Sequence, residues 1–206
     1  MSASQREMKA LLADLAEEAG KEITRPADPR TVMGAFCTAM SRRSKRAIQL
    51  VFRAFPPDIP VSGMRLDFGD RSMIVVEERA VPASQLVILG HELFHEEQGE
   101  CGHHLGGGIA AAAARGLADE ETPDAVRRAA EQILQVQEVP REALMALAAR
   151  AESFDEHEAD AETFGLLFGR HVRTWVTGPY AQGPVSGATV EERIDLSMTG
   201  NGGRLL

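Results

Sequence analysis

Residues 88–95 read Ile88-Leu89-Gly90-His91-Glu92-Leu93-Phe94-His95 and contain the pattern HExxH. Residues four apart on an α-helix lie within about 40° of each other around its axis, so the two imidazoles can aim at one point. That arrangement suits a tetrahedral zinc ion, and the glutamate beside the first histidine can act as a general base. The sequence therefore predicts His91 and His95 as metal ligands and Glu92 as a catalytic residue.

The residues around this pattern favour a buried helix. Apolar side chains flank the histidine face and also occupy the opposite side in a helical projection: Val87, Ile88 and Phe94 on the flanks, and Leu86, Leu89 and Leu93 opposite. A helix that is apolar on both sides is a buried one. Two ordinary histidines on an amphipathic helix are the competing interpretation. Buried polar groups are costly without partners, however, and a metal ion would be such a partner.

A later acidic segment, residues 155–162, offers a third ligand in the pattern ExxxD. Asp155, Glu158 and Glu162 cluster within about 60° on the predicted helix, and this stripe is the expected solvent face. Glu156 and Asp160 lie on the other side, where carboxylates need a cation or hydrogen-bond donors. We expect Glu156 to complete a zinc site and Asp160 to accept a hydrogen bond from a ligand histidine.

Three histidines compete for the role of third ligand. His157 points near two phenylalanines in the helical projection, where a core histidine is the simpler interpretation. His103 and His104 follow shortly after the HExxH pattern. The metzincin pattern HExxHxxGxxH would require glycine and histidine where this chain has Gln98 and Cys101, so that class does not fit.

Composition and charge predict a globular protein of the cytoplasm. The chain has 206 residues, 44% of them hydrophobic and 26% charged, which are ordinary globular values. Its net charge of −9 argues against direct nucleic-acid binding. The first 20 residues lack an apolar signal segment, and the longest apolar run, Ala143–Ala149, is too short to span a membrane. Cys37 and Cys101 suit a reducing cytosol better than a disulfide framework.

The order of predicted elements indicates an α+β fold. Helical patterns cover residues 4–20 and a segment that begins at Asp28-Pro29. Strands follow at 48–52, 63–68 and 72–76, the last two joined by a hairpin turn. We expect a small antiparallel sheet packed on a mostly helical domain that carries the HExxH helix and the later ExxxD helix. An edge strand of that sheet could bind an extended peptide.

The domain boundaries are expected to be simple. We predict one domain over residues 1–175 and a glycine-rich tail over 176–206, with one short helix around Val190–Met198. Sixty residues separate His95 from Glu156, and the alanine- and glycine-rich segment 99–150 is interpreted as an insertion beside the site.

Four features in order resemble the ImmA/IrrE family of metallopeptidases, especially its stand-alone actinobacterial members, which are described as toxin components. They are a helix (31–41), a short sheet (48–76), the HExxH stretch (88–95) and the acidic helix that ends in Phe-Gly-Leu-Leu (156–167). The resemblance covers roughly residues 30–170. It implies a zincin-like fold of gluzincin type, one zinc ion held by the two histidines and Glu156, and water activation by Glu92. Members of this family typically cleave, or act with, a helix-turn-helix repressor.

The leading hypothesis is therefore a zinc-dependent endopeptidase that cleaves a helix-turn-helix repressor or antitoxin. No helix-turn-helix segment is recognisable in this chain, so we expect the partner to be a separate protein, and we expect no membrane contact. The candidates for oxyanion or substrate contacts are His157, His103, His104 and Tyr180. The alternative is a non-catalytic, toxin-like binding module that sequesters a transcription regulator, although the intact Glu92 argues against it. The same ligands could also hold Mn²⁺ or Fe²⁺.

Overall fold

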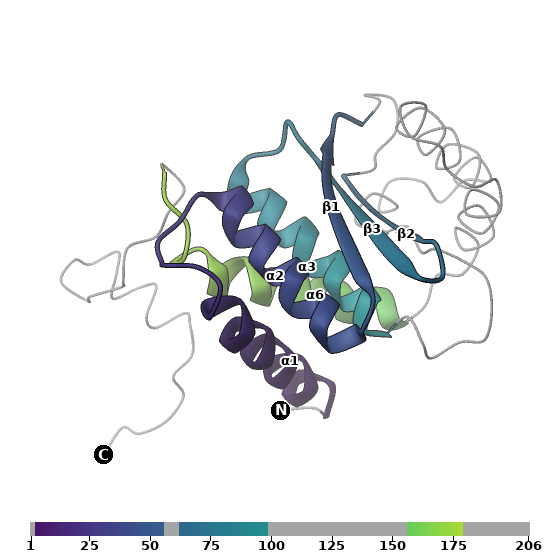
Figure 1. The fold of residues 1–206 in the computed structure, drawn as a ribbon. Coiled ribbons are helices and arrows are strands. Elements are labelled where there is room, and N and C mark those ends of the chain that lie inside the picture. The colour runs from purple at the N-terminus through teal and green to yellow at the C-terminus, as the bar shows by residue number, and fades with distance from the viewer. Residues whose placement is uncertain (1–2, 56–61, 99–155, 179–206) are drawn as a thin grey trace, which may run out of the picture.

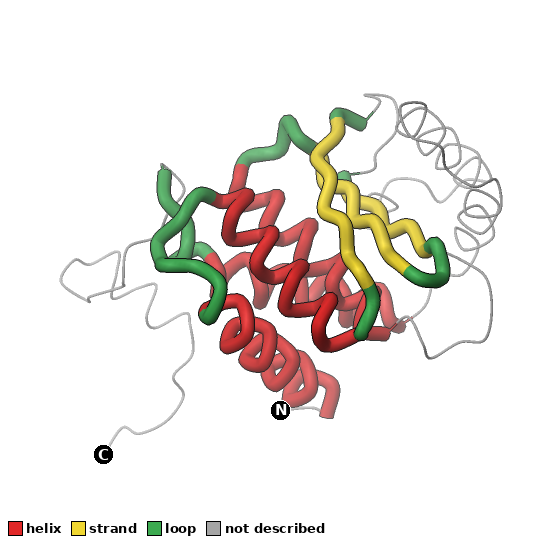
Figure 2. The backbone as a smooth tube through the Cα atoms, viewed as in Figure 1, coloured by secondary structure: helices red, strands yellow, loops and turns green. Residues whose placement is uncertain are grey.

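Helices pack on one face of a small sheet in the computed structural model, which describes residues 3–55, 62–98 and 156–178 (Figures 1 and 2). The elements are α1 (Ala3–Gly20), α2 (Pro29–Ser44), β1 (Ala47–Arg53), β2 (Gly63–Asp67), β3 (Arg71–Glu77), α3 (Pro82–Gln98) and α6 (Glu156–Val172). This is a mixed α/β architecture and is compatible with the expected α+β class. The segment 99–150, predicted to be an insertion, and all of the predicted tail 176–206 beyond residue 178 lie outside the described residues.

α2 begins and ends where local chemistry predicts. Asp28 caps α2, because its Oδ1 accepts the backbone N–H of Arg30 at 2.9 Å, and Pro29 occupies the first helical position. Lys45 follows the last helical residue with a φ of 56°, the left-handed conformation that commonly ends a helix. The bounds of α1 and α2 confirm the helices predicted at residues 4–20 and from Asp28-Pro29 onward.

The sheet corrects one expectation. β2 and β3 pair antiparallel around the turn at Gly69, as predicted for a hairpin. β1, however, pairs with β3 in parallel, and the strand order is β1-β3-β2. The prediction of an antiparallel sheet was thus wrong for β1. The chain leaves β1, enters β2 at the far edge and returns as β3 between them, so the first and third strands run in the same direction.

The core lies between the sheet and the helices. α2 and α3 cover the inner face of the sheet, while α1 packs on α2, and α6 packs on α3 (Figure 1). Phe36 of α2 meets Phe168 of α6 edge to face, with ring centroids 4.7 Å apart. Ile74 and Val76 of β3 enter the same core from the sheet. These contacts bury one face of every helix and leave α3 enclosed between the sheet and α6.

A short bridge closes the domain on the side opposite the hairpin turn. Ala27, which precedes α2, donates its N–H to the Trp175 carbonyl, and Thr177 donates to the Ala27 carbonyl, both at 2.8 Å. The guanidinium of Arg25 stacks 3.8 Å from the centroid of the Trp175 ring. Within the described ranges, no helix is long and apolar enough to cross a membrane.

Candidate metal centre

The two motif histidines converge on one point of α3. The Nε2 atoms of His91 and His95 lie 2.9 Å apart, and only 2% of the His91 surface is exposed. Two nitrogens that bind one tetrahedral zinc ion at about 2.0–2.1 Å are separated by about 3.3 Å. The observed separation is about 0.4 Å shorter and is a hydrogen-bond distance, so the two rings point at one position, where a single metal ion would hold them slightly further apart.

The helix around them is buried on both sides, as its pattern predicts. Leu86, Leu89 and Leu93 are completely buried, and Phe94 is only 5% exposed. Phe94 also stacks on Phe164 of α6, with ring centroids 5.4 Å apart. The histidines are therefore held on a helix whose orientation is set by packing on several sides, which pre-organises their rings.

Glu92 is fully buried and faces the edge strand β2. A Cβ on Gly63, the first residue of β2, would lie 2.7 Å from Glu92 Oε1 and closer still to Ile88 Cγ2. The carboxylate therefore sits against the backbone of this strand. A side chain at position 63 would collide with it, so the absence of a Cβ at Gly63 permits the close approach.

α6 runs antiparallel to α3 in close contact. A Cβ on Gly165 would lie 2.7 Å from the Val87 carbonyl oxygen and 3.2 Å from the His91 backbone nitrogen. One turn further along α6, Gly169 faces Val87. The N-terminal end of α6 consequently lies beside the end of α3 that carries His95. That is the end from which a third ligand on α6 would approach.

The predicted third ligand, Glu156, is the first residue of α6. Its side chain and that of His157 lie outside the description, so their predicted roles stay predictions. Among the side chains that the structure describes, which leave out those of residues 156–158, no three from histidine, cysteine, aspartate or glutamate gather closely enough to hold a metal. Asp160 Oδ2 accepts a hydrogen bond from Ser4 Oγ at 2.8 Å. Its predicted bond to a ligand histidine stays a prediction.

The remaining predicted site residues, His103, His104 and Tyr180, all lie outside the described residues. Cys37 is described and is buried in the core. Burial raises the pKa of its thiol to about 12, which keeps the sulfur protonated. Cys37 is therefore a core residue and not a nucleophile.

A buried polar network beside the histidines was missed by the sequence analysis. Arg65 of β2 donates from Nη1 to Glu96 Oε2 at 2.9 Å, and Ser72 of β3 donates to the same oxygen at 2.7 Å. All three side chains are buried. An arginine between the apolar residues Met64 and Leu66 was the available signal, because such a residue needs an acidic partner if its face is buried.

Asp67 and Arg46 extend this network toward the sheet edge. Arg65 Nη2 lies 3.4 Å from Asp67 Oδ2, and Arg46 pairs with the other oxygen of the same carboxylate. Partial burial opposes ionisation of Asp67. Hydrogen bonds from the Gly69 N–H and from Arg46 outweigh it and hold the Asp67 pKa below its usual range.

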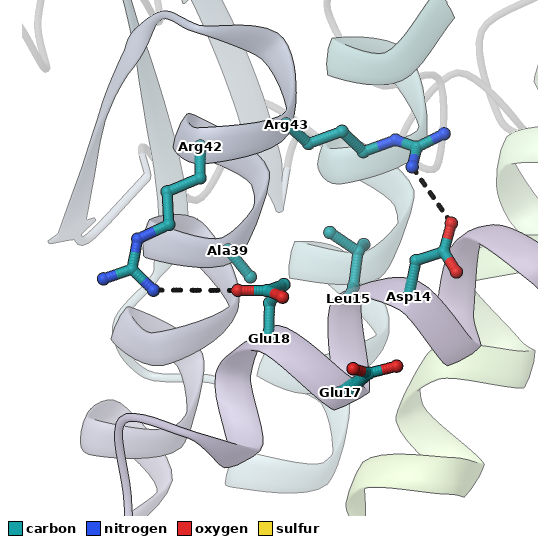
Figure 3. A pocket seen from close by; sticks show the side chains of 7 residues that line it. All are labelled: Asp14, Leu15, Glu17, Glu18, Ala39, Arg42 and Arg43. Atoms are coloured by element: carbon teal, nitrogen blue, oxygen red, sulfur yellow. Dashed lines mark hydrogen bonds and ion pairs between the residues drawn. The ribbon is translucent and has the colours of Figure 1, made fainter.

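A pocket of about 340 Å³ lies elsewhere, between α1 and α2 (Figure 3). Its lining is Asp14, Leu15, Glu17, Glu18, Ala39, Arg42 and Arg43, which includes none of the predicted site residues. Arg43 reaches Asp14 at 3.1 Å and Arg42 reaches Glu18 at 3.9 Å, so the acids and bases of this pocket pair with each other. Solvent-accessible pairs of this kind contribute little to stability.

Comparisons with protein-family models, with curated proteins and with solved structures give no match to this chain.

Proposed function

We propose that this protein is a zinc-dependent endopeptidase with a zincin-like fold of gluzincin type, similar to the ImmA/IrrE metallopeptidases. One observation carries the proposal. Two imidazole nitrogens converge at 2.9 Å on a buried helix, and a fully buried carboxylate occupies the residue between them that a general base requires. A pair of structural histidines does not need that carboxylate.

The proposed roles follow from the chemistry of each side chain. His91 and His95 supply two nitrogen ligands, and Glu156 supplies a carboxylate oxygen from the start of α6. A zinc ion held there would act as a Lewis acid toward the scissile carbonyl and the attacking water. Glu92 takes the proton from that water on its carboxylate and then delivers it to the leaving amine nitrogen. Its place against the β2 backbone limits the directions in which it can point.

The proposed substrate is a helix-turn-helix repressor or antitoxin. This chain carries a net charge of −9, and DNA-binding proteins present basic surfaces, so the two would attract each other before they dock. β2 is an edge strand of the sheet and lies next to Glu92, which would bring an extended peptide beside it close to the base.

Substitution of the base separates this function from its alternative. Glu92→Gln keeps the shape of the side chain but cannot accept the proton, so we expect unchanged metal content and a loss of cleavage of about 10²–10⁴-fold. Glu97→Gln on the same helix is the matched control, because Glu97 pairs with Arg43 and is partly exposed. Metal content is measured by elemental analysis, and cleavage is measured on purified helix-turn-helix repressors, with any that a neighbouring gene encodes tested first.

Each outcome assigns a function. If Glu92→Gln still controls its partner as the wild type does, the endopeptidase is refuted and a sequestering module is supported. His91→Ala should lose the metal. Unchanged metal content in Glu156→Ala would remove that residue from the ligand set.

A further inference from the structure

Two glutamates of α3 face the same strand and have different surroundings there. Glu92 and Glu96 lie one helical turn apart, and both are buried. The Glu92 carboxylate meets the backbone of Gly63, whereas the Glu96 carboxylate accepts bonds from Arg65 and Ser72. β2 therefore places a glycine backbone next to the Glu92 carboxylate and an arginine side chain next to the Glu96 carboxylate.

The spacings of the strand and the helix match. Gly63 and Arg65 are two residues apart, so they share one face of β2 and are separated by about 6.7 Å. Glu92 and Glu96 are four residues apart on α3, a rise of about 6 Å. Each strand residue therefore meets one glutamate. A shift of β2 along α3 would disturb both contacts together.

We propose that Arg65 is a positioning residue for Glu92. Its buried ion pair with Glu96 fixes the position of β2 along the axis of α3. This position holds the Gly63 backbone against the Glu92 carboxylate. The proposal rests on the proposed function, in which Glu92 is the base. A misplacement of about 1 Å in a reacting group can cost about a hundredfold in rate. The position of β2 along the axis of α3 therefore affects catalysis directly.

The energetics of the pair favour this role over a purely stabilising one. The Arg65 and Glu96 side chains are only 1% and 0% exposed, so both charges have been taken out of water. Apolar side chains of similar volume often stabilise a core as well as such a pair does. Apolar contacts have no direction, whereas a charged hydrogen bond fixes two atoms relative to each other. Ser72 adds a second donor to the same oxygen and anchors Glu96 to β3 as well.

The direct test measures the position of β2 relative to α3 and does not depend on activity. In the wild-type protein the Ile88 γ2-methyl group contacts Gly63, so a strong nuclear Overhauser effect is expected between that methyl and the Gly63 α-protons. The variant R65M/E96M replaces both charges with apolar side chains and leaves neither charge unpaired. We expect this variant to fold and to bind Zn²⁺ with unchanged affinity. The intensity of the Overhauser effect should fall at least threefold.

Activity supplies the second readout. In R65M/E96M we expect kcat for cleavage of the partner to fall at least tenfold while KM changes less than twofold, since Glu92 is displaced. The single substitution Arg65→Lys keeps a charged donor for Glu96, so its kcat should stay within about threefold of the wild-type value. R43M/E97M is the matched control, because it removes an ion pair between α2 and the same end of α3, and it should change neither readout.

The outcomes separate this inference from the proposed function. An unchanged Overhauser effect in folded R65M/E96M overturns the positioning role, whatever the activity. If R65M/E96M loses the Overhauser effect and the wild-type protein cleaves no partner, the position of β2 along α3 is set by Arg65 and the peptidase is refuted. If R65M/E96M does not fold, Arg65→Gln replaces it. Its amide cannot hold Glu96 and Asp67 together, so the same loss is expected, and an unchanged signal equally overturns the proposal.

Discussion

Substitution of Gly165 by alanine tests the contact that brings α6 against the HExxH helix. The new methyl group would lie 2.7 Å from the Val87 carbonyl oxygen and 3.2 Å from the His91 nitrogen. Both atoms belong to the backbone of α3, so a side-chain rotation cannot relieve the clash. The two helices must separate. Gly34, on α2, offers a matched comparison, because a Cβ there meets no atom within 4 Å.

Two effects of the new methyl group change the free energy of unfolding. A favourable effect occurs at both Gly165 and Gly34, and an unfavourable one occurs only at Gly165. Alanine is more favourable than glycine inside a helix by about 1 kcal/mol, and this applies to both sites. Overpacking adds a cost of about 1–3 kcal/mol, near the upper end when backbone must move, and it applies only at Gly165. We therefore expect Gly34→Ala to stabilise the protein by up to about 1 kcal/mol. Gly165→Ala should destabilise it by about 1–2 kcal/mol.

Urea unfolding followed by circular dichroism measures this difference, and thermal melting gives an independent estimate. A gap of 2–3 kcal/mol corresponds to roughly 4–12 °C in Tm for a chain of this size. Equal stability of Gly165→Ala and Gly34→Ala would refute the close approach of α6 to α3. It would also remove the reason for placing the start of α6 beside His95.

Two further predictions concern the ends of other elements. Asp28→Ala removes the cap of α2 and should lower the free energy of unfolding by about 1 kcal/mol in urea titration; an unchanged unfolding midpoint would contradict the capping role. The Arg79 side chain and backbone N–H groups hold the pKa of Glu77 at about 2, below its ordinary value of 4.5. The stability that Glu77 contributes should thus be complete above pH 4.5 and lost as pH falls toward 2. The wild type should therefore lose its advantage over Glu77→Gln across that interval, and a constant difference would exclude this cause.

Local patterns predicted the helices and the hairpin, because their signals lie within a few residues. Asp28 and Pro29 mark the start of α2, and the leucines around His91 mark a helix buried on both sides. The parallel pairing of β1 with β3 could not be predicted in this way. It depends on which edge the chain reaches after β1, and period-two alternation carries no information about the neighbouring strand.

The site was predictable only to the extent that its residues are close in sequence. His91, Glu92 and His95 share two turns of one helix, so their geometry follows from helical periodicity. Glu96 lies next to this motif, yet its partner Arg65 is 31 residues earlier on another element. Arg65 stands between Met64 and Leu66, and alternation alone does not decide which of these faces the helix. Strand register against α3 decides it, and that is a property of tertiary packing.

The antiparallel pairing of α3 and α6 has a consequence for the evolution of this scaffold. Gln98 ends one helix and Glu156 begins the other, so the chain leaves and re-enters the helix pair at the same end. Neighbouring antiparallel helices need as few as 2–8 linking residues, and each doubling of a loop costs only about 0.6 kcal/mol of closure entropy. This junction is therefore a tolerant insertion point. A change in the length of the segment that joins the helices should therefore leave the two histidines in their places.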